Sequence, residues 1–208
     1  MAAVRTPRVS APKSAVAVRG GKPTAAARAK GANRKLTTDD LRALIREIPD
    51  FPKPGILFYD ITTLLKDATA FRRAIDLMTE PYAGTHVDVV VGMESRGFIF
   101  SAPMAYQLKA GFVLVRKLGK LPAETASVEY ALEYGTNTLE IHKDSITKGQ
   151  RVLIVDDLLA TGGTVTGTID LVKRLGGEVV GLAFLVELLF LKGRDRLKGY
   201  GVRSVIQY

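Results

Sequence analysis

The chain has 208 residues, of which 47% are hydrophobic and 25% charged, enough for one domain with its own core. It has no cysteine and two histidines, which excludes disulfide scaffolds and cysteine nucleophiles and argues against a histidine metal site. No apolar run approaches the roughly 18 residues that a membrane-spanning helix needs. The net charge of +9 comes from residues 1–35, which hold nine basic and no acidic residues. The rest of the chain is neutral, which excludes a broadly basic folded body.

Residues 1–35 are rich in Ala, Arg, Lys, Pro, Gly and Ser and show no hydrophobic periodicity. This composition predicts a disordered basic tail, and it lacks the continuous apolar stretch of a secretory signal. Three interpretations stay open: a solvated tail or over-long gene start, an organellar transit peptide, and an arm that binds polyanions such as nucleic acid. We expect the folded domain to span residues 36–208 and to lie in the cytoplasm, unless the tail is a transit peptide.

From residue 36 onward, helical and strand-like patterns alternate. A helix capped by Thr37 or Thr38 is expected to continue to Ile48, where a Pro- and Gly-rich segment ends it, and a second to span Asp67–Met78. Further elements follow, with strands predicted at 87–91, 112–115, 151–155, 179–189 and 202–206, and helices at 98–108 and 165–175. This alternation predicts an α/β fold with a doubly wound, mainly parallel sheet flanked by helices. Ligands of such sheets bind beyond the carboxyl ends of the strands.

The most informative stretch is residues 151–164, RVLIVDDLLATGGT. An apolar strand leads into the adjacent carboxylates of Asp156 and Asp157, and a glycine-rich loop then opens a helix. Backbone amides at such a turn, with the positive end of the helix dipole, favour a phosphate group. Two carboxylates beside a phosphate site are explained if they accept hydrogen bonds from hydroxyls, such as those of a ribose, or meet a metal ion. The segment is neither a Walker loop nor a dinucleotide-binding turn.

This stretch resembles the diphosphate-sugar motif of the type I phosphoribosyltransferase family. Further matching segments occur in order at residues 51–61, 94–98, 116–122, 132–135 and 185–188. The resemblance covers residues 36–208 and implies the family's fold, a sheet with a small hood and a flexible lid loop, here residues 118–137. It also implies transfer of ribose 5-phosphate from phosphoribosyl pyrophosphate (PRPP) to N9 of a purine, with release of pyrophosphate and with Mg²⁺ as cofactor. The ion would be held by pyrophosphate, ribose hydroxyls and water, with no direct protein ligand.

The resemblance assigns the donor to three groups of residues. The loop at 160–164 would hold the 5′-phosphate, the two aspartates the ribose hydroxyls, and cations the pyrophosphate. The peptide between Glu94 and Ser95 is expected to be cis. Arg96 and Arg116 are the candidate catalytic cations. The candidate donor-binding residues are Ser95, Lys117, Lys120, Asp156, Asp157, Ala160, Thr161, Gly162, Gly163 and Thr164.

The same resemblance places the base under the hood and the proton chemistry in the lid. Phe58 would stack on the base, and backbone groups of Leu57 and Tyr59 would read its edge. Glu133 is the expected proton-handling catalytic residue, with Tyr134 beside it. Relatives that act on 6-oxopurines usually carry Asp at the position of Ala160, so the missing carboxylate favours adenine.

The expected function is therefore purine salvage, with AMP as the product, by a homodimer without membrane contact. One alternative is a phosphoribosyltransferase for another purine, hypoxanthine or xanthine. A second, from a different class, is an RNA-binding regulator built on the same fold. The neutral folded body argues against the regulator, since nucleic-acid binding requires a basic face.

Overall fold

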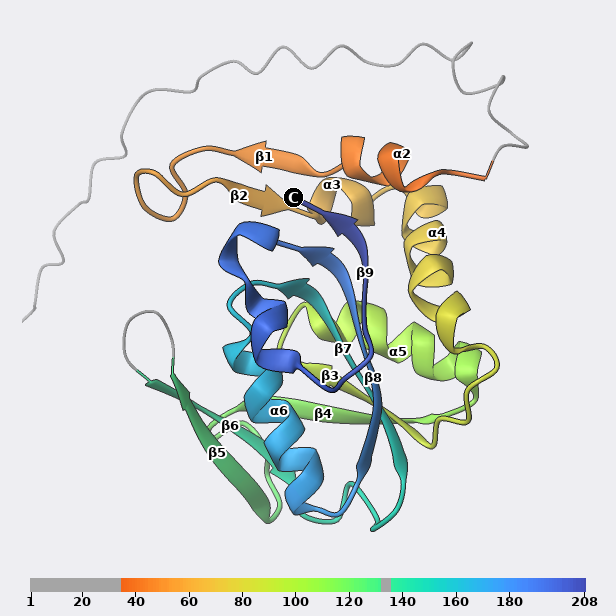
Figure 1. Cartoon of the computed structure of the whole chain (residues 1–208), viewed down its shortest axis with the longest axis vertical. Helices are drawn as coiled ribbons and strands as arrows, with labels where there is room; N and C mark the ends of the chain where they lie inside the picture. The colour runs from red at the N-terminus through yellow and green to blue at the C-terminus, as the bar shows by residue number, and fades with distance from the viewer. Residues whose placement is uncertain (1–34, 132–135) are drawn as a thin grey trace, which may run out of the picture. The chain divides into compact units, whose positions relative to one another are not determined.

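The computed structural model describes residues 35–131 and 136–208 (Figure 1). The predicted tail, apart from Lys35, and residues 132–135 of the predicted lid lie outside these residues. The helices are α2 (Thr38–Ala43), α3 (Thr62–Leu65), α4 (Ala68–Thr79), α5 (Gly97–Leu108) and α6 (Gly163–Arg174), with 3-10 turns η1 (Glu80–Tyr82), η2 (Leu189–Leu191) and η3 (Gly193–Leu197). The strands are β1 (Arg46–Ile48), β2 (Phe58–Asp60), β3 (Val89–Met93), β4 (Gly111–Lys117), β5 (Thr125–Ala131), β6 (Thr136–His142), β7 (Arg151–Leu159), β8 (Glu178–Glu187) and β9 (Val202–Gln207).

Seven strands form one sheet in the order β5-β6-β4-β3-β7-β8-β9. The pairs β3–β4, β3–β7, β7–β8 and β8–β9 are parallel, whereas β6 pairs antiparallel with both β4 and β5. From β3 the chain passes through α5 to β4 on one side, and from β7 through α6 to β8 on the other. The strand order therefore reverses between β3 and β7, the place where open α/β sheets bind ligands. The predicted doubly wound, mainly parallel sheet is confirmed.

Helices cover both faces of this sheet, and each face has its own core (Figure 1). Leu41, Ile75 and Phe100, from α2, α4 and α5, pack in one buried cluster. Val165 and Val172 of α6 belong to the other cluster. Neighbouring residues of β3 and β7 alternate between the two, as the two-residue period of a strand requires. Among the described residues, no helix is long and apolar enough to cross a bilayer.

The first predicted helix is shorter than its hydrophobic period suggested. Thr37 and Asp40 form a reciprocal capping box at the start of α2, but the helix ends at Ala43. Residues 46–48 instead form β1, which pairs antiparallel with β2. The guanidinium of Arg46 forms an ion pair with Asp60 across the two strands. This long-range pairing overrides the local helical signal, and β1, β2 and the segment between them form the predicted hood.

The predicted lid is a β-hairpin for most of its described length, a regular pairing that its weak hydrophobic period did not indicate. Strands β5 and β6 pair continuously from Thr125 opposite His142 to Ala131 opposite Thr136. Leu139 and Ile141 are buried in the core, which anchors β6. The buried Glu140 carboxylate accepts the backbone amides of Lys120 and Leu121, at 2.8 and 2.9 Å. The base of the lid is therefore fixed to the sheet.

Candidate active site

The carboxyl ends of β3, β4 and β7 bring most of the predicted site residues to one edge of the sheet. Glu94, Ser95 and Arg96 follow β3 directly, and Arg116 and Lys117 end β4. The two aspartates lie in the second half of β7, a strand that continues to Leu159, four residues beyond its predicted end. Because β3 lies between β4 and β7 in the sheet, the three groups are neighbours.

The loop after β7 has the geometry of an anion site. Gly162 has φ +83°, a left-handed conformation that side chains disfavour, and α6 begins at the next residue. The amides of the first helical turn lack partners within the helix, so they can donate to an anion at this end of the dipole. A small cavity of about 60 Å³ lies here, lined by Asp156, Phe184 and residues 158–165. The loop residues 160–164 thus lie together around a space of phosphate size.

The two aspartates lie directly behind this loop. Asp157 is 5% exposed, and its Oδ2 is 2.9 Å from Nε of Arg96. Burial, and secondly the charge of Asp157, raises the pKa of Asp156 well above its ordinary value. Burial also raises the pKa of Asp157, although the nearby Arg96 guanidinium opposes the shift. The Asp156 carboxylate also lies against the start of α5: a Cβ on Gly97 would lie 2.6 Å from its Oδ1.

Arg96 connects the aspartates with the hood. Its guanidinium carbon is 5.7 Å from the centre of the Phe58 ring, within the range of a cation–π contact. The peptide bond between Glu94 and Ser95 is cis, as predicted. Ser95 itself is exposed at this edge.

Glu94 organises the cations, a role that the sequence analysis missed. Its carboxylate accepts Nζ of Lys120 at 2.8 Å, the amide of Lys117 at 3.0 Å and Nη2 of Arg116 at 3.4 Å. Burial raises the pKa of Glu94, but the hydrogen bonds from Lys120, Lys117 and Arg116 outweigh it and lower the pKa to about 2. The three basic residues within 116–120 were the available signal, because such a cluster needs a nearby carboxylate to neutralise part of its charge.

Arg116 keeps one donor unused. Its Nε is buried, and no hydrogen-bond partner for it lies within the described part of the chain. Its Nη1 donates to the Lys120 carbonyl at 3.1 Å. An unsatisfied buried guanidinium donor is costly, so the site favours an additional acceptor, such as an anionic oxygen.

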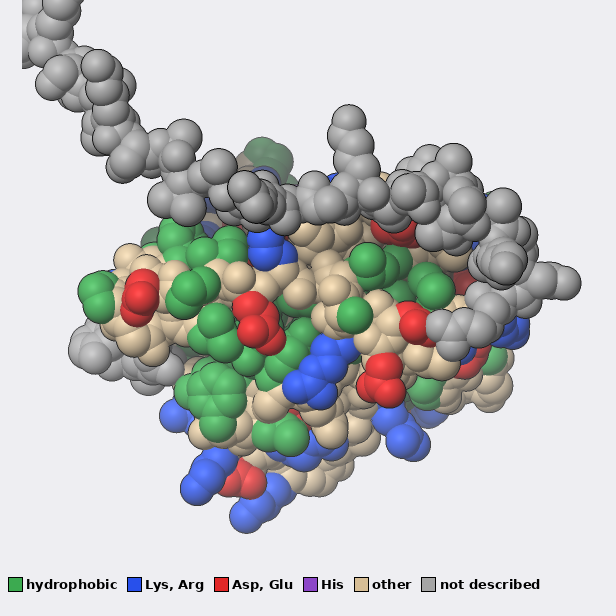
Figure 2. All heavy atoms as spheres, turned by 90° about the horizontal axis from the view of Figure 1, so that it is seen from above, with side chains coloured by type: hydrophobic (Ala, Val, Ile, Leu, Met, Phe, Trp, Pro, Cys, Tyr) green, Lys and Arg blue, Asp and Glu red, His purple; other side chains and the backbone are tan. Residues whose placement is uncertain are grey.

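The hood presents different side chains to its two sides. Phe58 contacts Arg96 and packs edge-on against Phe51, with ring centres 5.1 Å apart. Tyr59, the next residue in the strand, packs against Tyr208 at 3.9 Å between ring centres. A cavity of about 380 Å³ separates the hood from the turn after β8; its lining residues are Gly55, Ile56, Leu57, Tyr59, Leu188, Phe190 and Leu191. Hydrophobic side chains gather on the hood side of the molecule (Figure 2).

Not every predicted residue can be placed. Glu133 and Tyr134 lie outside the described residues, so their positions relative to the sheet edge stay predictions. Within the described residues, no group of three or more His, Cys, Asp or Glu side chains could hold a metal ion. The other predicted residues belong to the hood or to this sheet edge.

Comparisons with known proteins agree with this arrangement. Residues 61–206 match the family model of the phosphoribosyl transferase domain. The chain is 60% identical over 170 residues to an adenine phosphoribosyltransferase of Koribacter versatilis, covering 82% of this chain and 93% of the relative.

Solved structures give the same result. The adenine phosphoribosyltransferase of Thermoanaerobacter pseudethanolicus superposes with a TM-score of 0.81 at 56% identity, covering 83% of this chain and all of that one. The Saccharomyces cerevisiae enzyme, solved with adenine and an imino-altritol bisphosphate, gives 0.77 at 38% identity and covers 81% and 97% of the two chains. The chain therefore belongs to the phosphoribosyltransferase family and, within it, to the adenine phosphoribosyltransferases.

Proposed function

We propose that this sheet edge transfers ribose 5-phosphate from PRPP to N9 of adenine, the AMP-forming reaction of purine salvage that characterises this family. One observation carries the assignment of the site. A loop around a cavity of phosphate size, two carboxylates and a cation cluster lie side by side at the ends of three neighbouring strands. Their order matches the 5′-phosphate, the ribose hydroxyls and the pyrophosphate of the donor.

The loop and the aspartates hold the sugar. Amides of residues 161–164 and the hydroxyls of Thr161 and Thr164 donate to the 5′-phosphate. Asp156 and Asp157 accept hydrogen bonds from the ribose hydroxyls. Their negative charge also favours the positive charge that develops on the sugar as the bond to pyrophosphate breaks.

The cations stabilise the departing pyrophosphate. Arg116 offers its unpaired Nε, and Lys117, Lys120 and the loop at Ser95 and Arg96 surround the same edge. Glu94 holds Arg116 and Lys120 in place through two ion pairs. Pyrophosphate oxygens then meet cations that are already arranged, which lowers the cost of ordering them.

The residues fit a Mg²⁺ ion that is carried mainly by the substrate. Asp156 and Asp157 are hard oxygen donors of the kind that Mg²⁺ prefers, but two carboxylates alone do not make a protein cage. When bound, Mg²⁺ supplies additional neutralisation of the pyrophosphate charge. Chelation with EDTA is expected to abolish AMP formation, and added MgCl₂ to restore it.

The hood and the lid act on the base. Phe58 stacks on adenine, and backbone groups of Leu57 and Tyr59 read its edge. Tyr59 packs its ring on Tyr208, so its main chain rather than its phenol is assigned to recognition. Ala160 leaves out the carboxylate that 6-oxopurine enzymes use, and Glu133 handles the proton at the purine or at the leaving group.

A homodimer is the proposed assembly. Ile99 and Tyr106 of α5 are 36% and 87% exposed, and Phe112 and Leu114 of β4 are 39% and 36% exposed. Phe98 and Phe112 are in ring contact, which joins the two groups into one apolar surface for a second copy. Light scattering of the wild type should give twice the chain mass, and Tyr106→Glu should shift it toward the monomer.

We also assign catalysis to residues 36–208 and the reaction to the cytoplasm. A variant that begins at residue 36 is expected to keep full activity and to lose any binding to polyanions. Fluorescent fusions of the full and truncated chains would reveal organellar import, the outcome that a transit peptide predicts.

The decisive experiment measures initial rates with PRPP and Mg²⁺. Adenine should give AMP and pyrophosphate, and hypoxanthine, guanine and xanthine should react far more slowly. A faster reaction with hypoxanthine would replace the proposed base. No reaction with any purine, together with RNA binding, would favour the regulator.

A further inference from the structure

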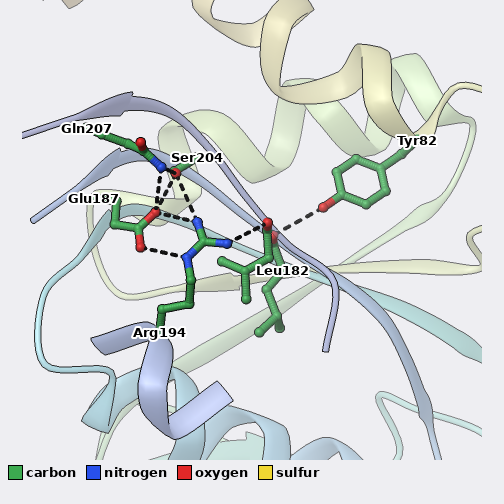
Figure 3. A network of polar contacts seen from close by, with 7 residues as sticks. Tyr82, Leu182, Glu187, Arg194, Ser204 and Gln207 are labelled. Carbon is green, nitrogen blue, oxygen red and sulfur yellow. Dashed lines mark hydrogen bonds and ion pairs between the residues drawn. The ribbon is translucent and has the colours of Figure 1, made fainter. Parts of the chain in front are cut away.

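A buried carboxylate at the end of β8 has no part in the chemistry described above. The side chain of Glu187 is 3% exposed, and it faces Arg194 of η3 (Figure 3). Nε of Arg194 donates to Oε1 at 2.8 Å and Nη2 to Oε2 at 2.5 Å, a bidentate ion pair. Ser204 and Gln207 of β9 donate to the same Oε2, at 2.5 and 3.3 Å.

Glu187 and Arg194 form an ion pair, and the network around it connects β8, η3 and β9. The hydrogen bond from Arg194 is the main reason that the pKa of Glu187 lies below its ordinary value; burial opposes the shift. Arg194 also donates to the Val202 carbonyl at 3.2 Å. Such a bidentate pair fixes the orientation of both side chains. The pair therefore determines where η3 lies relative to β8 and β9.

The start of η3 lies directly against the phosphate loop. A Cβ on Gly193, the residue before Arg194, would overlap the carbonyl oxygen of Ala160 and lie 3.1 Å from the amide nitrogen of Gly162. Conversely, a Cβ on Gly162 would lie 2.7 Å from the Gly193 carbonyl oxygen. The two backbones are in contact with no room for a side chain on either.

Glu187 also reaches the loop from its other end. Residue 187 stands opposite Leu159 in the parallel register of β7 and β8. The amide of Leu188 donates to the Leu159 carbonyl at 2.9 Å. The loop is therefore held at its entrance by β8 and at its turn by η3, and the Glu187–Arg194 pair joins these two supports.

We propose that Glu187 and Arg194 are positioning residues for the 5′-phosphate loop: they hold Gly193 against Ala160 and Gly162 and so set the direction of the loop amides. The proposal rests on the proposed function, because it assigns the loop to PRPP. Neither side chain touches the substrate. Their effect is on affinity for the phosphate end of the donor, because small displacements of aligned donors weaken binding strongly.

Two variants test the pair by different routes. Glu187→Gln removes the negative charge with little change of volume. Gly193→Ala keeps both side chains of the pair but adds a Cβ that would overlap the Ala160 carbonyl oxygen, so the loop must move. Both should raise the KM for PRPP about tenfold, because the loop amides are then displaced from the phosphate. The values of kcat and of the KM for adenine should stay within about twofold of the wild type. Matched controls are Glu80→Gln, which breaks the exposed 2.9 Å pair with Arg73, and Gly201→Ala, whose Cβ meets open space. Neither control should change any kinetic constant.

Thermal unfolding of each variant separates positioning from stability. If Glu187→Gln and Gly193→Ala are folded at the assay temperature and leave the KM for PRPP unchanged, the proposal is wrong. It is equally wrong if kcat and both KM values change together, because the pair would then serve overall stability.

Calorimetry makes this result independent of the reaction assigned. Titration of wild type and variants with PRPP and Mg²⁺ in the absence of any base measures the donor site alone. A tenfold weaker affinity in both variants supports the positioning role even if adenine proves to be the wrong base. Absence of PRPP binding by the wild type would overturn the proposed function and this inference together.

Discussion

Asp157→Asn tests the assignment of the two aspartates to the ribose. The change removes a buried charge that forms an ion pair with Arg96, with 2.9 Å between Oδ2 and Nε, and that in our proposal accepts a hydrogen bond from a ribose hydroxyl. A hydrogen bond to a charged group contributes about 1.5–3 kcal/mol, which corresponds to a rise of about 10- to 150-fold in the KM for PRPP. Arg96 is 39% exposed, so water can solvate it after the change and the loss of folding stability should be small.

The same variant should alter the pH dependence. Burial is the first cause of the raised pKa of Asp156 and the charge of Asp157 the second, so removing that charge lowers the pKa of Asp156. The acid limb of kcat/KM for PRPP should therefore move to lower pH. Asp170→Asn is the matched control, since Asp170 forms an exposed pair with Arg174 on α6. A folded Asp157→Asn enzyme with unchanged KM, or an acid limb at higher pH, would refute the assignment.

Three further variants address the base, the cations and the lid. Phe58→Ala should raise the KM for adenine about tenfold or more, a typical loss for one base–aromatic stack, and leave that for PRPP unchanged; equal effects on both would contradict stacking. Glu94 has a pKa of about 2 against an ordinary 4.5, so it stabilises the fold above about pH 4.5 and loses this effect as the pH falls toward 2. In urea unfolding, the free energy of unfolding of Glu94→Gln at pH 7 should be about 1–2 kcal/mol below that of the wild type, after allowance for the exposed partners of Glu94. This difference should narrow below pH 4.5. A difference independent of pH would contradict a stabilising role for the Glu94 charge. Glu133→Gln should lower kcat by about 10² or more if Glu133 handles the proton, and an unchanged kcat would end that assignment.

Local patterns were sufficient for the central layers of the fold. The buried runs of β3 and β7 and the amphipathic α4 and α6 lie where their periods predicted. The motif around Asp156 and Gly162 was also predictable, because its residues are contiguous and its backbone requirement is local. The cis peptide before Ser95 followed only from the family resemblance.

Features that depend on distant partners could not be predicted in this way. Residues 46–48 have a helical period, yet Arg46 pairs with Asp60 and the segment becomes a strand. The hydrogen bonds to Glu94 join residues more than 20 positions apart, and the role of Gly193 depends on a loop in another βα unit. In each case the interaction is set by packing, which a single sequence does not display.

The contact between Gly97 and Asp156 has a practical consequence for redesign. The start of α5, directly after the loop assigned to pyrophosphate, leaves no space for one additional carbon beside the carboxylate assigned to the sugar. Libraries that aim at donors with altered sugars should therefore randomise the segments around residues 97 and 156 jointly. Screening either segment alone would discard sequences whose fit requires a compensating change in the other.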